Sequence, residues 1–114
     1  MATHFSTAGV AIGGEYVTAR QWINFDGDGT VVIRDSYNTS SITDTGTGYF
    51  TVTFAANLTN GNYCAQATSN PYNYTGGYAG VKEITNSSFK LDIRETDNNN
   101  IDGDPISTLA IDGD

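Results

Sequence analysis

YFTVTF at residues 49–54 and SFKLDIRET at residues 88–96 are the two stretches that decide the fold class of this chain. Apolar side chains occupy every second position in both stretches: Phe50, Val52 and Phe54 in the first, and Phe89, Leu91 and Ile93 in the second. Side chains of a β-strand point alternately to the two faces of its sheet, so this period of two predicts strands with one face in a core. The intervening residues are polar or aromatic, which predicts that the opposite face meets solvent or a partner.

Shorter strand-like runs flank these two stretches, at residues 19–26, 30–38, 63–67, 81–85 and 106–111. Turn-forming Asp-Gly and Asn-Gly pairs separate several of them. About seven strands at short intervals predict an all-β fold, namely an antiparallel β-sandwich of jelly-roll or Ig-like type. We expect eight side chains to lie mostly inside: Trp22, Val32, Phe50, Val52, Phe54, Phe89, Leu91 and Ile93.

Length and composition agree with a single β-domain. The chain has 114 residues, of which 38% are hydrophobic and 11% aromatic, and one domain of this size is typical. Its many Thr, Asn, Ser and Gly residues are poor helix formers, which excludes a helical bundle. We expect residues 1–18 to form a short extended arm, interrupted at Gly13 and Gly14, and residues 19–114 to form the β-domain.

Charge narrows the possible partners. The formal net charge is −8, which repels phosphate backbones and anionic bilayers, so we expect no nucleic acid partner. No run reaches the ~18 apolar residues of a membrane span, and MATHFSTAGV lacks the basic and apolar regions of a signal peptide. We therefore expect no membrane insertion, and a protein that folds where it is made.

Few residues offer catalytic chemistry, so we expect no enzyme activity. His4 is the only histidine and is expected to be a solvated residue of the arm, which leaves no evident general base. Cys64 is the only cysteine, which excludes an intrachain disulfide. Because Cys64 lies in an alternating apolar run, we expect it to be a small buried hydrophobic residue rather than a reactive thiol.

Three Asp-Gly-Asp units, at residues 26–28, 102–104 and 112–114, raise the question of calcium. Residues 98–104 match the first positions of a calcium loop, but Leu109 stands where the bidentate Glu is needed. Asp-Gly is also ordinary turn chemistry. We favour turns, with a calcium site as the alternative, and expect no cofactor or obligatory metal.

The segment SNPYNYTGGYAG at residues 69–80 has the composition of a contact loop. Tyrosine rings supply rigid amphipathic surface, and asparagine amides supply adaptable hydrogen bonds. The candidate contact residues are Asn70, Tyr72, Asn73, Tyr74 and Tyr78. The alternative is that these rings fold back onto the sandwich edge or into a subunit contact.

The chain resembles a β-domain found at the C-terminal tips of bacteriophage and prophage tail fibres. The resemblance follows an Ala-x-x-Trp-x-x-Phe strand, a Val-x-Ile-Arg strand, a Ser-Ser-Ile-Thr-Asp-x-Gly-Thr-Gly corner, a Tyr-x-Val-x-Phe strand and an Asn-Tyr strand. The corresponding residues are Ala19, Trp22, Phe25, 32–34, 40–48, 49–54, Asn62 and Tyr63. Later strands extend the similarity over roughly residues 19–114. The 72–78 loop is not a shared feature, so receptor identity does not carry over.

The resemblance implies a homotrimeric virion surface protein of the tail-fibre-tip type that contacts the host envelope, a glycan being the expected ligand. Family members usually cap a long shaft, whereas about eighteen residues precede the domain here, so we expect a free-standing virion protein. A capsid decoration protein is the main alternative, and a free carbohydrate-binding module is a third. The expected location is the virion, after synthesis in the host bacterial cytoplasm.

Overall fold

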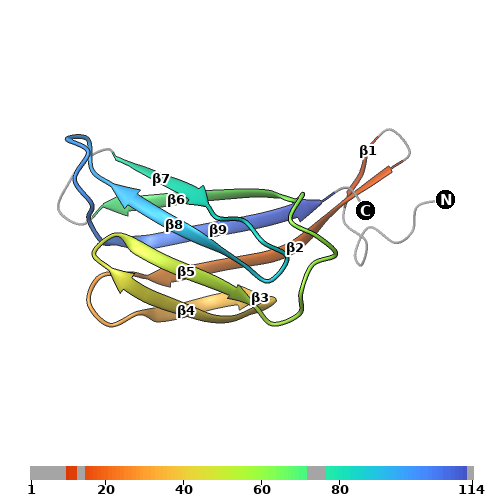
Figure 1. The fold of residues 1–114 in the computed structure, drawn as a ribbon, viewed down its shortest axis with the longest axis horizontal. Helices are drawn as coiled ribbons and strands as arrows, with labels where there is room; N and C mark the ends of the chain where they lie inside the picture. The colour runs from red at the N-terminus through yellow and green to blue at the C-terminus, as the bar shows by residue number, and fades with distance from the viewer. Residues whose placement is uncertain (1–9, 13–14, 72–76, 113–114) are drawn as a thin grey trace.

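The protein is built entirely from β-strands in the part of the chain that the computed structural model describes, residues 10–12, 15–71 and 77–112 (Figure 1). Its nine strands are β1 (Val10–Ile12), β2 (Glu15–Asp26), β3 (Val32–Tyr37), β4 (Thr39–Gly46), β5 (Tyr49–Phe54), β6 (Cys64–Pro71), β7 (Tyr78–Lys82), β8 (Ser88–Arg94) and β9 (Gly103–Asp112). Within these ranges no helix could cross a membrane.

The strands form two antiparallel sheets. One has five strands in the order β1-β2-β9-β6 with β3 also paired to β2, and the other has four in the order β4-β5-β8-β7. Their inner faces meet at the core, where the ring centroids of Phe25 on β2 and Phe50 on β5 lie 5.4 Å apart. The predicted all-β architecture, with antiparallel sheets arranged as in a β-sandwich, is confirmed.

Two strands go beyond the predicted seven. β1 falls in the segment predicted as an arm, and pairs with the start of β2 in a hairpin. β4 falls in the Ser/Thr/Gly-rich stretch predicted as a corner. Thr suits a pleated strand, but β4 is an edge strand with mostly exposed side chains, so it carries little of the apolar alternation that reveals a buried strand.

A single layer of apolar side chains fills the space between the sheets. Six of the eight predicted core residues are buried there, each at most 4% exposed: Phe50, Val52, Phe54, Phe89, Leu91 and Ile93. The other buried members are Ile23, Phe25, Leu58, Tyr63, Ile106 and Ala110. Aromatic rings meet edge to face within this layer, with centroid distances of 5.6 Å from Phe54 to Tyr63 and 5.8 Å from Phe54 to Phe89.

The predictions for Trp22 and Val32 are wrong, because Trp22 is 37% exposed and Val32 is 53% exposed. On β2 the inward positions belong to Gln21, Ile23 and Phe25. Gln21 is buried because its amide donates to the Thr39 hydroxyl at 2.9 Å and accepts from the Thr108 hydroxyl at 3.0 Å. The alternation of Ile23 and Phe25 selects the face that is buried, so the prediction for Trp22 is wrong because it follows the size of that side chain rather than the period of the strand. Val32 lies on β3, which is paired only to β2.

Asn38 turns the chain from one sheet to the other, between β3 and β4. Its backbone is left-handed, with φ of 52°, a conformation that asparagine tolerates better than most residues. Its side-chain Nδ2 donates to the carbonyls of Arg20 at 2.9 Å and Ala56 at 3.1 Å, and its Oδ1 accepts from the Ala56 N–H at 2.7 Å. One side chain therefore ties this crossing to β2 and to the segment after β5.

Gly48 ties the hairpin turn between β4 and β5 to β8 and to the loop before β9. Its N–H donates to the Asp102 carboxylate at 2.8 Å, and its carbonyl accepts from the Ile93 N–H at 2.7 Å. Its φ is +75°, and an added Cβ would lie 2.6 Å from the Ile93 carbonyl oxygen. Only glycine fits, because both the backbone angle and the approach of β8 exclude a side chain.

Replacing Gly48 should therefore destabilise the fold far more than replacing Gly29. Gly29 has nearly the same φ, +74°, but no atom lies within 4 Å of its added Cβ. We expect Gly48→Ala to lower the free energy of unfolding by about 2 kcal/mol or more, and Gly29→Ala to cost about 1 kcal/mol from the backbone alone. Urea unfolding of both variants tests this difference. An equal decrease in the free energy of unfolding for both variants would show that the close packing around Gly48 does not contribute to stability.

Candidate functional site

The described members of the predicted contact loop lie on the strands that flank it. Asn70 is exposed near the end of β6, and its Nδ2 donates to the Asp104 carbonyl at 3.2 Å. Tyr78 is the first residue of β7 and is 50% exposed, and its hydroxyl donates to the Asn98 side-chain oxygen. Tyr72, Asn73 and Tyr74 lie outside the described residues, so their contact role stays a prediction.

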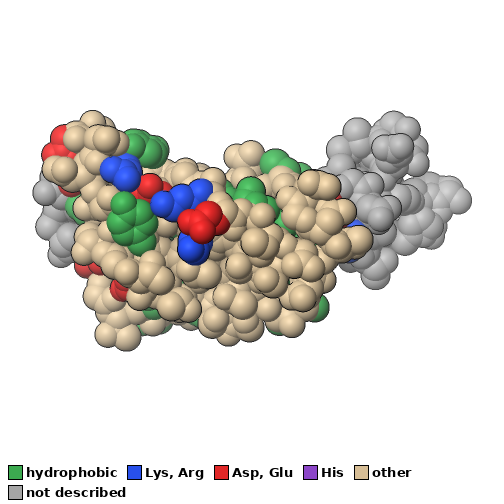
Figure 2. Space-filling view, in the orientation of Figure 1, with side chains coloured by type: hydrophobic (Ala, Val, Ile, Leu, Met, Phe, Trp, Pro, Cys, Tyr) green, Lys and Arg blue, Asp and Glu red, His purple; other side chains and the backbone are tan. Residues whose placement is uncertain are grey.

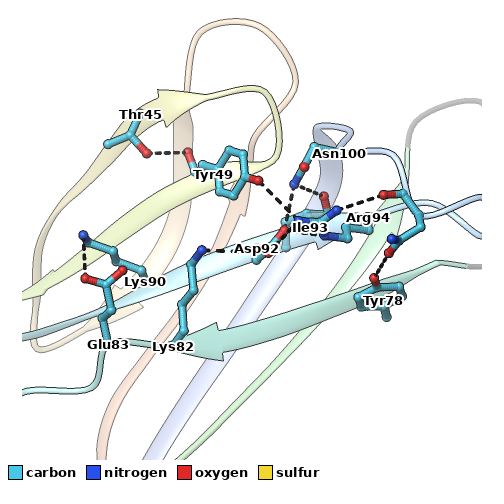
Figure 3. A network of polar contacts seen from close by, with 11 residues as sticks. Thr45, Tyr49, Tyr78, Lys82, Glu83, Lys90, Asp92, Ile93, Arg94 and Asn100 are labelled. Carbon is cyan, nitrogen blue, oxygen red and sulfur yellow. Dashed lines mark hydrogen bonds and ion pairs between the residues drawn. The ribbon is translucent and has the colours of Figure 1, made fainter.

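Tyr78 belongs to a larger polar surface on the outer side of β5, β8 and β7, which we call the polar face. Strand register places its members in three adjacent rows. Tyr78 lies beside Arg94, Asp92 lies between Gly80 and Tyr49, and Lys82 lies beside Lys90. Figure 3 shows the tyrosine, lysine, arginine and aspartate side chains of these rows on the three strands, together with Asn100 from the loop before β9. The polar face therefore begins at the strand where the predicted contact loop ends.

Asp92 is the centre of the hydrogen-bond network on the polar face. Its Oδ1 accepts from Arg94 Nε at 3.0 Å and from Asn100 Nδ2 at 2.7 Å, and Lys82 Nζ lies 3.9 Å from its Oδ2. Burial alone would raise the pKa of Asp92, but the hydrogen bonds from Arg94 and Asn100 and the nearby positive charges together lower that pKa below its ordinary value. Asp92 is thus a fixed anion that positions the cations around it.

Arg94 links this centre to both tyrosines of the polar face. One of its terminal nitrogens donates to the Tyr49 hydroxyl at 3.3 Å, and the other donates to the Asn98 carbonyl at 2.9 Å. The Asn98 side chain in turn accepts from the Tyr78 hydroxyl. The two phenol groups are therefore held in place by one guanidinium, which leaves fewer side-chain conformations to be lost when a ligand binds.

Positive charge is concentrated on this face. Lys82, Lys90 and Arg94 are three of the five basic residues in a chain of net charge −8. In Figure 2, basic and acidic side chains gather over β5, β7 and β8 beside side chains coloured hydrophobic, a class that includes tyrosine. Lys82 and Lys90 are direct cross-strand partners, an arrangement that is unfavourable for like charges. This unfavourable pair is a reason to look for function here.

A hollow of about 190 Å³ lies on this surface, lined by Thr45, Tyr49, Phe50, Lys82, Glu83, Lys90 and Leu91. The Lys82 ammonium lies 5.0 Å from the centroid of the Tyr49 ring, and Lys90 pairs with Glu83 at 3.0 Å. Glu83 has a φ of 50°, a left-handed backbone that is rare for a residue with a side chain and that tends to occur at functional sites. Ammonium groups, a hydroxyl and an aromatic ring suit a hydroxyl-rich ligand that carries anionic groups.

Alternation predicts an outer strand face for Tyr49 and Lys90, but no sequence pattern identifies the hollow as a site. Alternation in residues 88–94 indicated that Lys90, Asp92 and Arg94 share a face. The sequence has no signal for the register that brings Tyr49 beside them, since residues 55–87 separate β5 from β8, whereas the short connection 83–87 joins β7 to β8. Only the pairing Tyr49↔Asp92 and Lys82↔Lys90 assembles the site.

A larger hollow of about 310 Å³ has a structural explanation instead. It is lined by Arg20, Tyr37, Asn38, Ala56, Asn57, Leu58, Thr59 and Asp112. The Arg20 guanidinium pairs with Asp112 at 2.7 Å, and the Asn38 amide is held by backbone groups of Arg20 and Ala56. The polar side chains in this hollow therefore hold strands together.

The remaining candidate residues have local roles or lie outside the described residues. Cys64 is exposed, so its predicted burial is wrong: the inward positions of this part of β6 belong to Ala65 and Ala67, which pack against the core. His4 lies outside the described residues.

The Asp-Gly-Asp units differ in structure: residues 26–28 lead into the bend after β2, as predicted, whereas Gly103 and Asp104 begin β9, so the predicted turn at 102–104 is wrong. Asp26 Oδ1 accepts from the Asp28 N–H at 2.8 Å, and the Asp102 carboxylate holds Gly48. Within residues 10–12, 15–71 and 77–112, no group of three or more His, Cys, Asp or Glu residues is placed to hold a metal ion.

Neutralising Asp92 should destabilise the protein in a pH-dependent way. Because the folded-state pKa of Asp92 is lowered, its stabilising effect is present above the unfolded-state pKa and is lost as pH falls through the folded-state value. We expect Asp92→Asn to cost about 1–2 kcal/mol at pH 7, and the gap to the wild type to shrink below about pH 4. Urea unfolding at pH 7 and pH 3 measures this. A gap that stays constant would contradict the ionic role.

Comparisons with protein-family models, with curated proteins and with solved structures found no match to this chain.

Proposed function

We propose that this chain is a bacteriophage virion structural protein, displayed on the particle as a tail-fibre or appendage tip, where it contacts a glycan of the host envelope. The resemblance of residues 19–114 to tail-fibre tips supports the virion role. The structural observation that supports host contact is the polar face, where three cations and two ordered tyrosines share one sheet surface. As part of the same proposal, the sandwich is of jelly-roll or Ig-like type.

The charged side chains of the polar face bear on how an acidic protein could bind an anionic glycan. Bacterial envelope glycans carry phosphates and carboxylates, and a chain of net charge −8 repels them at long range. The Debye length is ~8 Å at physiological salt, so distant acidic residues are largely screened when the ligand is in contact. At that distance the charges that matter are those of the hollow itself, where Lys82 and Lys90 stand beside Glu83 and Asp92. Tyrosine rings and asparagine amides of the adjoining loop add short-range contacts.

Several copies would raise the apparent affinity of weak individual sites. We propose a homotrimer, as the resemblance implies. Linking binding sites in this way raises apparent affinity by ~10² to 10⁴ without new contacts.

Capsid decoration is the second candidate, favoured by a separate observation. Trp22, Tyr37 and Leu109 are exposed on the five-stranded sheet, at 37%, 53% and 40%, and a second surface of this kind would suit attachment to a capsid. A free carbohydrate-binding module is the third candidate. Electron microscopy of virions labelled with antibody to this protein distinguishes the three: tail label supports the tip, head label supports decoration, and unlabelled virions exclude both.

Removing the paired lysines should weaken attachment without unfolding the protein. We expect the Lys82→Gln, Lys90→Gln double variant to lower adsorption to susceptible bacteria by about tenfold, since close charge contacts have effects of this size. Arg34→Gln is the matched control, because Arg34 is also exposed and ion-paired, with Asp104, but lies on β3 of the other sheet. Equal adsorption by both variants would remove the polar face from host contact.

The tyrosine loop gives a separate test of the same function. If Tyr72 and Tyr74 contact the ligand, the double change to Ala should reduce adsorption by at least tenfold while the unfolding midpoint stays within about two degrees, because buried aromatic contacts in interfaces commonly contribute ~2 kcal/mol each. Thermal unfolding and adsorption are measured on the same preparation. Lost stability with unchanged adsorption would identify the rings as packing residues.

A further inference from the structure

An apolar row crosses the outer side of the five-stranded sheet. Trp22 on β2 is the register partner of Tyr37 on β3 and of Leu109 on β9. Directly opposite residues of neighbouring strands lie ~4.5–5.5 Å apart, so these three exposed side chains are adjacent. We call them the apolar row. Trp22 is the only tryptophan in the chain, and tryptophan and tyrosine are the residue types most enriched where proteins bind one another.

The surface beside the apolar row carries no charge on β9 and β6, whereas on β3 the exposed Asp35 is the register partner of Asn24 and Arg34 donates to the Asn24 side-chain oxygen at 3.4 Å. The outward positions of the neighbouring strand segments are Asn24 on β2, Ser107 and Ile111 on β9, and Cys64, Gln66 and Thr68 on β6. A hollow of about 250 Å³ next to Leu109 is lined by Gln66, Ala67, Thr68, Ser107, Thr108 and Leu109. Charged groups such as the Arg20–Asp112 ion pair stand at the margins of this surface. An uncharged centre with a charged rim is the usual composition of a protein interface.

We infer that this face packs against a neighbouring copy of this chain. Phosphorylated or carboxylated ligands would need free cations, and the two arginines at the edges of this face are already ion-paired, Arg20 with Asp112 and Arg34 with Asp104. A basic protein would be attracted to the acidic parts of the surface instead. Two copies of net charge −8 repel one another, and an uncharged surface is where their contact brings the fewest like charges together. The inference rests on the proposed self-association, not on the host-contact role.

The dimensions of the face suit such a contact. Four strands, β3, β2, β9 and β6, lie side by side, which gives a width of ~19 Å at ~4.8 Å per strand. β9 has ten residues, which gives a length of ~33 Å. A face of this size approaches the ~800 Å² per partner that a stable interface commonly buries.

Trp22 makes the contact directly measurable, because the fluorescence of the protein reports on one site. We expect light scattering to show an oligomer at micromolar concentration, with Trp22 emission that shifts to the red and becomes accessible to acrylamide on dilution. Leu109→Arg should weaken the association, so that the protein concentration at which half of the oligomer has dissociated rises at least tenfold. Ile84→Arg is the matched control, since Ile84 is 37% exposed and lies between β7 and β8, away from this sheet. Tyr37→Arg repeats the test if Leu109→Arg does not fold by circular dichroism.

Three results would overturn the inference, and they differ in what else they affect. A monomer at all concentrations removes both this face and the proposed homotrimer. An oligomer whose Trp22 stays accessible to acrylamide, and which Leu109→Arg leaves unchanged, removes only the face. A monomer whose Trp22 becomes shielded when purified capsid or tail proteins are added identifies another virion protein as the occupant. Adsorption to bacteria is a separate measurement in each case.

Discussion

The packing of one layer of side chains between two sheets is the constraint on which the rest of this structure depends. Phe25 and Phe50 meet across the layer with centroids 5.4 Å apart, and the inner positions of β5 and β8 are fully apolar. A chain that is only 38% hydrophobic fills such a thin core with every second residue of a few strands. The other residues of those strands face outward, and their chemistry is therefore free to serve binding.

The outer faces of the two sheets carry different kinds of side chain. The four-stranded sheet presents Lys82, Lys90 and Arg94 with two tyrosines, whereas the five-stranded sheet presents the apolar row, with charged residues at its margins. Because the faces lie on opposite sides of the core, a ligand on one and a neighbouring copy on the other would not compete. Asn38 and Gly48 tie two connecting turns to neighbouring strands by side-chain and backbone hydrogen bonds. These bonds help to fix the strands that carry the two faces.

Alternation predicted the fold wherever a strand has one apolar and one polar face, as in β5 and β8. It failed where a strand has no such contrast. On β2 the face of Ile23 and Phe25 also carries Gln21, which is buried through two hydrogen bonds, while the large Trp22 lies on the outer face. The contacts that bury Gln21 come from distant strands and leave no trace in local sequence. Cys64 was misplaced because its run of small residues fits either face. For the site, the sequence indicated which residues share a strand face, but the register that joins Tyr49 to Lys82 depends on long-range pairing.

The cross-strand pair Lys82 and Lys90 also limits how the polar face can work. Each ammonium already has an anionic neighbour, Asp92 at 3.9 Å and Glu83 at 3.0 Å, and an anionic ligand must compete with these carboxylates. Exposed ion pairs contribute little each, typically under ~1 kcal/mol, so the competition is nearly balanced and a single site would bind weakly. Weak sites become effective when several copies act together. In the proposed assembly, contact through the apolar row would bring several copies together and leave the polar face of each copy exposed. The two surfaces would therefore depend on one another for function.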